Sequence, residues 1–125
     1  MKVYIAGPMT GMPGWNFRAF DAAAEFLRGC GYVVVSPADL DREVGFDPSS
    51  ESAVTKDFLR SALTRDLAAV CACDGVAVLD GWLSSLGAVV EVALAVRLGL
   101  RVLDAGTLED ITDDTREYIR WRLLA

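Results

Sequence analysis

Four short apolar segments recur along the chain, and segments with helical periodicity separate them. The apolar segments are residues 3–6, 32–35, 75–79 and 101–103. Their near-continuous apolar character predicts strands buried on both faces, because a strand with one solvent face alternates apolar and polar residues. Strands that alternate with helices form a parallel sheet covered by helices on both faces. We therefore predict an α/β fold, a Rossmann-like (flavodoxin-like) three-layer sandwich with a four- to five-stranded parallel sheet, in one domain over residues 1–125.

Apolar residues at intervals of three and four predict the first helix. Asn16 is a suitable cap for its beginning, and Gly29 and Gly31 are suitable residues for its end. The apolar stripe of this helix is Phe17, Phe20, Ala24 and Leu27.

The same periodicity predicts three more helices. A second helix covers about residues 54–72, Ser84 or Ser85 caps a third, and Thr112 begins a fourth. The apolar stripe of the second helix is Phe58, Ala62, Leu63, Leu67 and Val70. Residues 38–53 are polar and irregular and are predicted as a long loop.

The chain has no histidine, which removes whole classes of catalytic site. Ser-His-Asp and Cys-His arrangements and the usual histidine-containing zinc sites are excluded. The three cysteines, Cys30, Cys71 and Cys73, lack a metal-binding spacing, and we expect free thiols in or near the core. Acid–base or nucleophilic chemistry then depends on carboxylates, hydroxyl groups, Lys, Tyr or Cys, and we predict no metal and no cofactor.

Charge and apolarity restrict the partners of the chain. Apolar residues make up 53% of the sequence, and the formal net charge is −6. An acidic surface repels a phosphate backbone, so we predict no nucleic-acid partner, although backbone N–H groups can still hold a small anion. No signal peptide is visible, and no apolar run approaches the roughly 18 residues that span a bilayer. We therefore expect a cytoplasmic protein with no membrane contact.

The loop after the first strand is a candidate ligand site, because open parallel sheets bind ligands at the carboxyl ends of their strands. This loop reads Gly7-Pro8-Met9-Thr10-Gly11. Its glycines allow close approach of the backbone, and its N–H groups could bind an anion. The loop matches neither the dinucleotide fingerprint nor the phosphate-binding P-loop. An ordinary strand-to-helix turn explains it as well.

Glu91 is the candidate reactive carboxylate, six residues after the possible cap Ser85 in the string Ser-Leu-Gly-Ala-Val-Val-Glu. Gly87 weakens a helix by roughly 0.5–1 kcal/mol relative to alanine, which suggests that another group passes close to the backbone there. By helical spacing Glu91 shares a face with Ala88 and Ala95, which favours a buried or pocket position. The spacing alone also allows a solvent-exposed face.

Asp66 and three aromatic residues complete the candidate set. Asp66 lies near the apolar stripe of its predicted helix, and either a site carboxylate or a surface salt bridge with Arg65 or Arg60 explains it. Tyr4 lies inside the first strand, while Trp15 and Trp82 lie in loops at the expected ligand edge. These tryptophans could stack on a flat base, or they could cap the local core or form a subunit contact.

Several of these motifs follow one another in a characteristic order. They are a strand ending in Gly7, a Gly-Pro-Met-Thr-Gly loop, the Arg65-Asp66 pair, Asp74, and Ser-Leu-Gly-x-x-x-Glu-x-x-x-Ala at residues 85–95. This order resembles the nucleoside 2-deoxyribosyltransferase superfamily, including its 2′-deoxynucleoside 5′-phosphate N-hydrolase branch. The longer string Gly-Trp-x-x-Ser-x-Gly-Ala-x-x-Glu at residues 81–91 is similar to that of an uncharacterised phage and bacterial branch. The resemblance covers residues 3 to about 103.

The resemblance implies an enzyme that breaks the N-glycosidic bond of a nucleoside or nucleotide. In that scheme Glu91 attacks the anomeric carbon and forms a glycosyl-enzyme ester, which water or a second base resolves. Asp66 manages protons, Tyr4 lines the pocket near Glu91, and Ser85 binds a 5′-phosphate in the hydrolase branch. The full substrate-binding set is Gly7, Pro8, Met9, Thr10, Gly11, Asn16, Trp82, Ser85 and Gly87. A two-carboxylate scheme of this kind needs neither histidine nor metal.

One departure from the family pattern leaves the substrate open. The nucleotide hydrolases have a phosphate-binding serine and arginine where this chain has Pro8 and Thr10, so an unphosphorylated nucleoside or another ribosyl compound also fits. The resemblance further implies a homo-oligomer, a dimer or larger, with Trp15, Trp82 or the second helix at the contact. Two other functions stay open: a non-catalytic module that sequesters a nucleotide or ADP-ribose-like ligand, and a structural role in assembly.

Overall fold

The computed structural model describes residues 1–49 and 54–123 and contains a four-stranded sheet. The strands are β1 (Lys2–Ala6), β2 (Val33–Val35), β3 (Gly75–Val78) and β4 (Arg101–Asp104), in the spatial order β2-β1-β3-β4. Every adjacent pair is parallel. The predicted α/β class with a parallel sheet is confirmed, and each strand begins and ends within one residue of its expected bounds.

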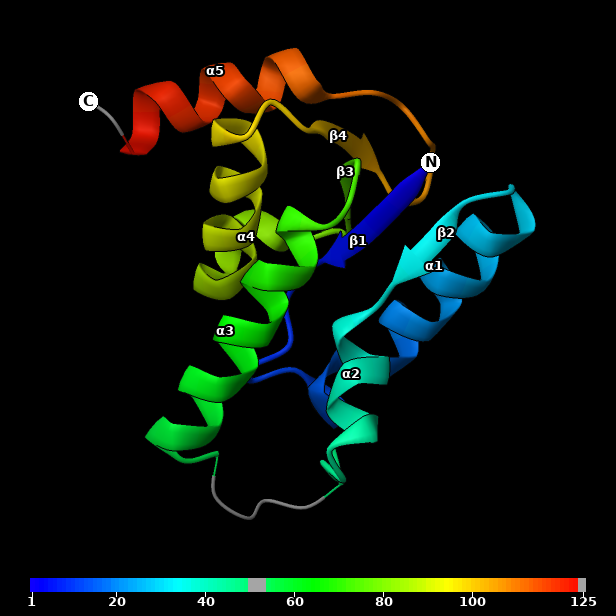
Figure 1. The fold of residues 1–125 in the computed structure, drawn as a ribbon, viewed down its shortest axis with the longest axis vertical. Coiled ribbons are helices and arrows are strands. Elements are labelled where there is room, and N and C mark those ends of the chain that lie inside the picture. The colour runs from blue at the N-terminus through cyan, green and yellow to red at the C-terminus, as the bar shows by residue number, and fades with distance from the viewer. Residues whose placement is uncertain (50–53, 124–125) are drawn as a thin grey trace.

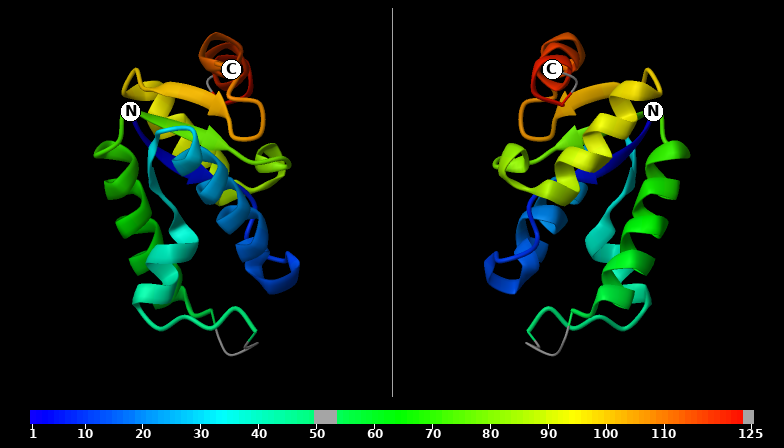
Figure 2. Two further views of the ribbon diagram at one scale, coloured as in Figure 1. Left: turned by 90° about the vertical axis from the view of Figure 1, so that its right-hand side faces the viewer. Right: turned by 90° about the vertical axis from the view of Figure 1, so that its left-hand side faces the viewer.

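Helices cover both faces of this sheet, which makes three layers (Figure 1). They are α1 (Phe17–Gly29), α2 (Pro37–Glu43), α3 (Lys56–Cys71), α4 (Leu86–Arg97) and α5 (Thr112–Leu123), with 3₁₀ turns η1 (Pro13–Asn16) and η2 (Trp82–Ser84). Figure 2 shows α1 on one side of the sheet and the neighbouring helices α3 and α4 on the other. The last helix, α5, crosses the C-terminal end of α4 and packs beside β4 (Figure 1).

The central strand β1 contributes to both halves of the core, because successive side chains of a strand point to opposite faces. Val3 and Ile5 pack in the half of the core that α1 covers. Tyr4 and Ala6 pack in the half that α3 and α4 cover. The strand order also places the topological switch point between β1 and β3, which is where sheets of this kind bind their ligands.

Helix α2 lies inside the segment predicted as a loop, so that prediction is wrong for residues 38–43. Ser36-Pro37 directly follows the strand, and Pro37 occupies the first turn of the helix. Proline is suited to that position because its fixed φ is helical and its missing N–H would be unpaired there. Ala38 and Asp41 are buried on the inner face of α2. Residues 50–53 of the predicted loop lie outside the described residues.

Asn16 does not cap α1 as expected. Its backbone is left-handed at φ 60°, as are those of Gly14 and Trp15 before it, and its side chain makes no capping hydrogen bond. The side-chain amide instead donates to the carbonyl oxygen of Pro8 at 2.9 Å. Asn16 therefore links the end of the loop between β1 and α1 to the beginning of the same loop.

The other helix beginnings follow the expected chemistry. The Ser85 hydroxyl accepts a hydrogen bond from the backbone N–H of Ala88, which confirms a cap for α4 and selects Ser85 over Ser84. Thr55 caps α3 in the same way. The predicted apolar stripe of α3 is wrong at one position, because Leu63 is exposed on the outer face.

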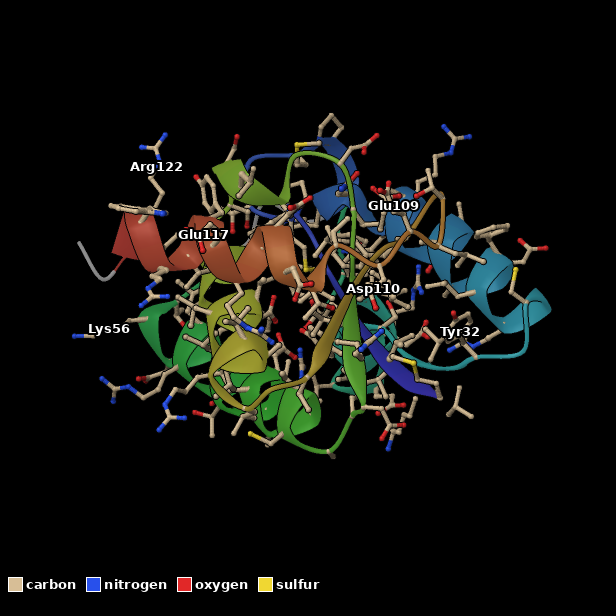
Figure 3. All side chains as sticks on the ribbon, turned by 90° about the horizontal axis from the view of Figure 1, so that it is seen from above. Tyr32, Lys56, Glu109, Asp110, Glu117 and Arg122 are labelled. Atoms are coloured by element: carbon tan, nitrogen blue, oxygen red, sulfur yellow. The ribbon has the colours of Figure 1, made fainter. Side chains whose placement is uncertain are left out.

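The surface is rich in charge, and side chains such as Lys56 and Arg122 point away from the body (Figure 3). Cys73 is buried as expected, whereas Cys30 and Cys71 are exposed, which corrects their predicted place in or near the core. Within residues 1–49 and 54–123, no helix has both the length and the apolar character needed to cross a membrane.

Candidate functional site

Tyr4, Asp66 and Glu91, the three residues predicted to be catalytic, come together on one side of the sheet. Tyr4 is in β1, Asp66 is in α3 and Glu91 is in α4. The Tyr4 hydroxyl donates a hydrogen bond to Oε2 of Glu91 across 87 residues of sequence. Asp66 acts electrostatically on both residues. We call Tyr4, Asp66 and Glu91 the carboxyl cluster.

Glu91 occupies the inner face of α4 and is only 6% exposed. It lies on the same face as Ala88 and Ala95, as helical spacing suggested, and the alternative of a solvent-exposed position is wrong. An ionised carboxylate is poorly stabilised where water is excluded, so burial raises the pKa of Glu91 to about 8. The hydrogen bond from Tyr4 opposes this rise and the negative charge of Asp66 adds to it. Glu91 is therefore mainly protonated at neutral pH.

Asp66 is also buried, but it has a cationic partner. Arg65 donates to Oδ1 of Asp66 from Nε at 2.9 Å and from Nη2 at 2.8 Å. Burial raises the pKa of Asp66 to about 6, and the bonds from Arg65 limit the rise. The predicted salt bridge with Arg65 exists, but at a buried carboxylate rather than on the surface. At neutral pH Asp66 is mainly ionised, so the two carboxyl groups hold one proton between them.

Burial also raises the pKa of Tyr4 well above its usual range, and the neighbouring carboxyl groups add to the effect. The phenol therefore keeps its proton at any physiological pH and serves the cluster as a hydrogen-bond donor. It can stabilise negative charge on Glu91 without itself carrying charge.

Asp41 of α2 is a site residue that the sequence analysis missed. Its Oδ1 accepts a hydrogen bond from Nη2 of Arg65 at 2.7 Å, so Arg65 bridges Asp41 and Asp66. The signal that could have found it is Pro37 at a first helical position, with Ala38 and Asp41 three residues apart on one face. We call Asp41, Arg65 and Asp66 the buried bridge.

The loop after β1 meets the loop after β3 at the switch point. Gly7 is buried, and a Cβ atom at this position would lie 2.8 Å from the Leu79 side chain, so packing requires glycine there. Gly81 has a left-handed φ of 81°, and a Cβ there would lie 3.6 Å from Cγ of Pro8. Of the other predicted loop residues, Met9 packs against the core while Thr10 and Gly11 are exposed.

Ser85 and Gly87 flank the beginning of α4, where backbone N–H groups favour anions. The Ser85 hydroxyl already accepts the capping bond from Ala88 at 3.3 Å. Gly87 is exposed, and a Cβ there would meet no described atom within 4 Å. The close approach expected at Gly87 is thus not made by another described part of the chain, and the first turn of α4 is open.

Both loop tryptophans have partners within the chain. The Trp82 ring packs against the core beneath α4 and lies edge-on to Tyr118 of α5, with 6.5 Å between ring centroids. Trp15 is edge-on to Phe46 at 5.4 Å, and Phe46 stacks on Phe58. These contacts favour the core-capping interpretation over base stacking for both tryptophans.

Asn16 lies apart from the carboxyl cluster. It lines a hollow of about 500 Å³ between α1 and the carboxyl ends of β3 and β4. Ala19, Phe26 and Gly106 also line this hollow, and Glu91 does not. The structure therefore groups Tyr4, Asp66 and Glu91 but leaves Asn16 in a different setting.

Comparison with known proteins gives a family. Residues 1–104 match the family described as a domain of unknown function (DUF4406). No curated protein matches the chain. The matched range includes the whole sheet, the carboxyl cluster and Asp41, whereas α5 begins after it. The chain belongs to the DUF4406 family.

Proposed function

We propose that this protein cleaves the N-glycosidic bond of a (deoxy)nucleoside or nucleoside 5′-monophosphate, by hydrolysis or transfer, with Glu91 as the nucleophile. The observation that carries the proposal is the carboxyl cluster: a buried glutamate, a buried aspartate and a phenol from three separate elements. The resemblance of the motifs around Gly7, Asp66 and Glu91 to the deoxyribosyltransferase superfamily supports the same chemistry.

The reaction runs in two steps through a covalent ester. An oxygen of ionised Glu91 forms a bond to C1′ of the sugar while the bond from C1′ to the base nitrogen breaks and its electron pair goes to the base. Asp66 in its protonated form gives its proton to the departing base. Water, or the nitrogen of a second base, then attacks C1′, returns a proton to Asp66 and releases Glu91. Two displacements at C1′ retain the configuration of the sugar.

The proton shared by Glu91 and Asp66 sets the pH dependence of this scheme. Reaction needs one proton on the pair, placed on Asp66 while Glu91 is ionised. Below about pH 6 both carboxyl groups are protonated and no nucleophile exists, and above about pH 8 both are ionised and no acid exists. The rate is therefore expected to be bell-shaped with a maximum near neutral pH. The hydrogen bond from Tyr4 favours ionised Glu91 and so favours the reactive arrangement.

A substrate panel tests the proposal directly. The protein is incubated with nucleosides and their 5′-monophosphates at pH 7, and free base is measured by chromatography. We expect base release from at least one substrate and a loss of about a thousandfold or more in Glu91→Gln. This substitution keeps size and neutrality, so the fold is expected to survive. Glu25→Gln on the exposed face of α1 is the matched control and should keep full activity. Undiminished turnover in Glu91→Gln would exclude the nucleophile.

A non-catalytic module that sequesters a nucleotide or ADP-ribose-like ligand is the second candidate. The burial of Glu91 favours it, because burial raises the pKa of this carboxyl group to about 8 and a protonated carboxyl group is not nucleophilic. Calorimetry separates the two functions. Tight binding of an unmodified ligand with no product, retained in Glu91→Gln, would establish the module and exclude the enzyme.

We also propose that the protein is a homo-oligomer that associates through the outer faces of α3 and α4. Leu86 is 82% exposed, and Leu59, Leu63 and Val90 are exposed on the same two neighbouring helices. Exposed apolar side chains that gather on adjacent helices are typical of interaction sites. Sedimentation should give at least a dimer for the unaltered protein and a smaller species for Leu86→Lys. A monomer at every concentration of unaltered protein would rule the association out.

A further inference from the structure

Arg65 and Asp66 are adjacent in sequence, yet they form a two-bond contact that neighbouring helix positions do not make unaided. Successive residues of a helix point in directions about 100° apart, so side chains at positions i and i+1 do not face one another. The Arg65 guanidinium must therefore fold back along α3 to reach Asp66. Its side chain is 25% exposed, so an extended conformation towards water is open to it.

Asp41 supplies the contact that holds Arg65 in this folded-back position. Its carboxylate accepts a hydrogen bond at 2.7 Å from Nη2, the same nitrogen that donates to Asp66, and its side chain is only 9% exposed. The helix that carries Asp41 packs against α1 and β1 and buries Pro37 and Ala38. Arg42 of α2 pairs with Asp21 of α1 at 2.6 Å, and Asp39 of α2 pairs with Arg28 of α1.

We propose that Asp41 is a positioning residue, whose carboxylate anchors Arg65 on Asp66 and thereby decides which carboxyl group of the cluster carries the shared proton. Its importance for turnover rests on the proposed function, but its control of the proton does not. With Arg65 anchored, Asp66 stays ionised at neutral pH and the proton stays on Glu91.

The groups that face Asp66 come from four elements. They are Tyr4 from β1, Arg65 from α3, Asp41 from α2 and Glu91 from α4. Asp41 influences Asp66 in two opposite ways. Its negative charge repels the ionised form of Asp66, whereas its hold on Arg65 stabilises that form. The second effect is the larger, because Arg65 donates two hydrogen bonds to Asp66, and these bonds and its charge act on the pKa of Asp66 more strongly than the charge of Asp41 does.

Because these two effects are opposite, the direction in which the pKa of Asp66 changes tests the proposal. The side-chain carboxyl carbons of Asp66 and Glu91 are titrated by NMR in the unaltered protein and in Asp41→Asn. Release of Arg65 should raise the titration midpoint of Asp66 by about one pH unit. If Asp41 acted only as a nearby negative charge, the midpoint would fall instead. A midpoint that falls or stays unchanged overturns the proposal.

A matched control variant and a second NMR measurement separate the loss of the Arg65 contact from the mere loss of a negative charge on α2. Asp39→Asn removes the same charge from the same helix without touching Arg65, and it should leave the Asp66 midpoint unchanged. In the unaltered protein, hydrogen bonds from Nε and Nη2 to two carboxylates predict separate, slowly exchanging resonances for the Nη groups of Arg65. One averaged resonance would overturn the proposal even if Asp41→Asn did not fold.

The same experiments separate this inference from the proposed function. If the substrate panel yields no free base but Asp41→Asn raises the Asp66 midpoint, Asp41 controls the proton and the glycosidic chemistry is wrong. If the protein is active and the midpoint does not rise, the chemistry stands and Asp41 is not its positioning residue. If both hold, the bell-shaped rate profile of Asp41→Asn should begin its rise at a higher pH than that of the unaltered protein.

Discussion

Two arginines in this protein each bridge a pair of aspartates, and the two bridges differ chiefly in how much water reaches them. Arg42 contacts Asp21 and Asp39 through side chains that are 44%, 46% and 40% exposed. Its bond to Asp21 joins α2 to α1, whereas Asp39 lies on α2 itself. Exposed pairs of this kind contribute little to stability, because water screens the charges and solvates them equally well apart.

The buried bridge uses the same chemical unit in a drier place. The side chains of Asp41 and Asp66 are 9% and 13% exposed, and Arg65 is 25% exposed. The buried bridge joins α2 to α3. The charges of its members Asp66 and Arg65 also influence the pKa of Glu91. Both bridges consist of one arginine and two aspartates. The comparison therefore indicates that burial, rather than residue composition, lets the second bridge influence the protonation of a neighbouring carboxyl group.

The largest expected effect concerns Glu91, the cluster carboxyl that has no hydrogen-bonded cation. The folded protein holds a proton on Glu91 up to about pH 8, whereas the unfolded chain releases it near the ordinary value of 4.5. Between these values the folded state binds more protons, so stability falls as pH rises through this window. Glu91→Gln should remove about 3 kcal/mol of this decline, measured by urea unfolding at pH 5, 7 and 8.5. Parallel pH curves for the two proteins would contradict the buried, protonated state of Glu91.

A direct comparison of the two arginines follows. Arg65→Ala should lower the free energy of unfolding at pH 7 by about 2 kcal/mol, because it leaves two buried carboxylates without their cation. Arg42→Ala should cost less than about 1 kcal/mol, since its aspartates return to water. Denaturant unfolding of both variants measures the difference. Equal losses would mean that burial does not distinguish the bridges.

The smallest effect is a difference in salt sensitivity. A double-mutant cycle between Arg42 and Asp21 should give a coupling of about 0.5 kcal/mol at low salt and close to zero in 1 M NaCl. The cycle between Arg65 and Asp41 should retain most of its coupling, because ions do not enter a buried contact. A similar loss of both couplings would place Arg65 in effective contact with bulk solvent.

The sequence predicted the features of the fold that depend on the pattern of neighbouring residues. The four strands follow from continuous apolar runs, and the inward position of Glu91 agrees with its spacing from Ala88 and Ala95. Ser85 as a cap follows from its place before a helical pattern. The pairing of Tyr4 with Glu91 could be suspected only through the family resemblance, because nothing local links residues 87 positions apart.

Features that depend on backbone conformation or on partners distant in sequence could not be predicted. Asn16 looked like a cap by residue type, but its left-handed backbone turns its side chain back to Pro8. Asp41 was hidden because the same dipeptide, Ser36-Pro37, suits both the end of a strand and the beginning of a helix. Its partner Arg65 lies 24 residues away, on a helix whose position only the folded structure gives.

The contact between Tyr4 and Glu91 also has a consequence for how the protein matures. Tyr4 is in the first strand, and its partner comes 87 residues later, after three of the four strands. Contacts between such distant parts of a chain form late, because a long loop must close first. A growing chain on the ribosome thus carries its phenol from the start but cannot assemble the acid–base cluster until α4 has emerged. Any reactivity of Glu91 towards a sugar would arise only after α4 has emerged, when three of the four strands of the sheet have already been made.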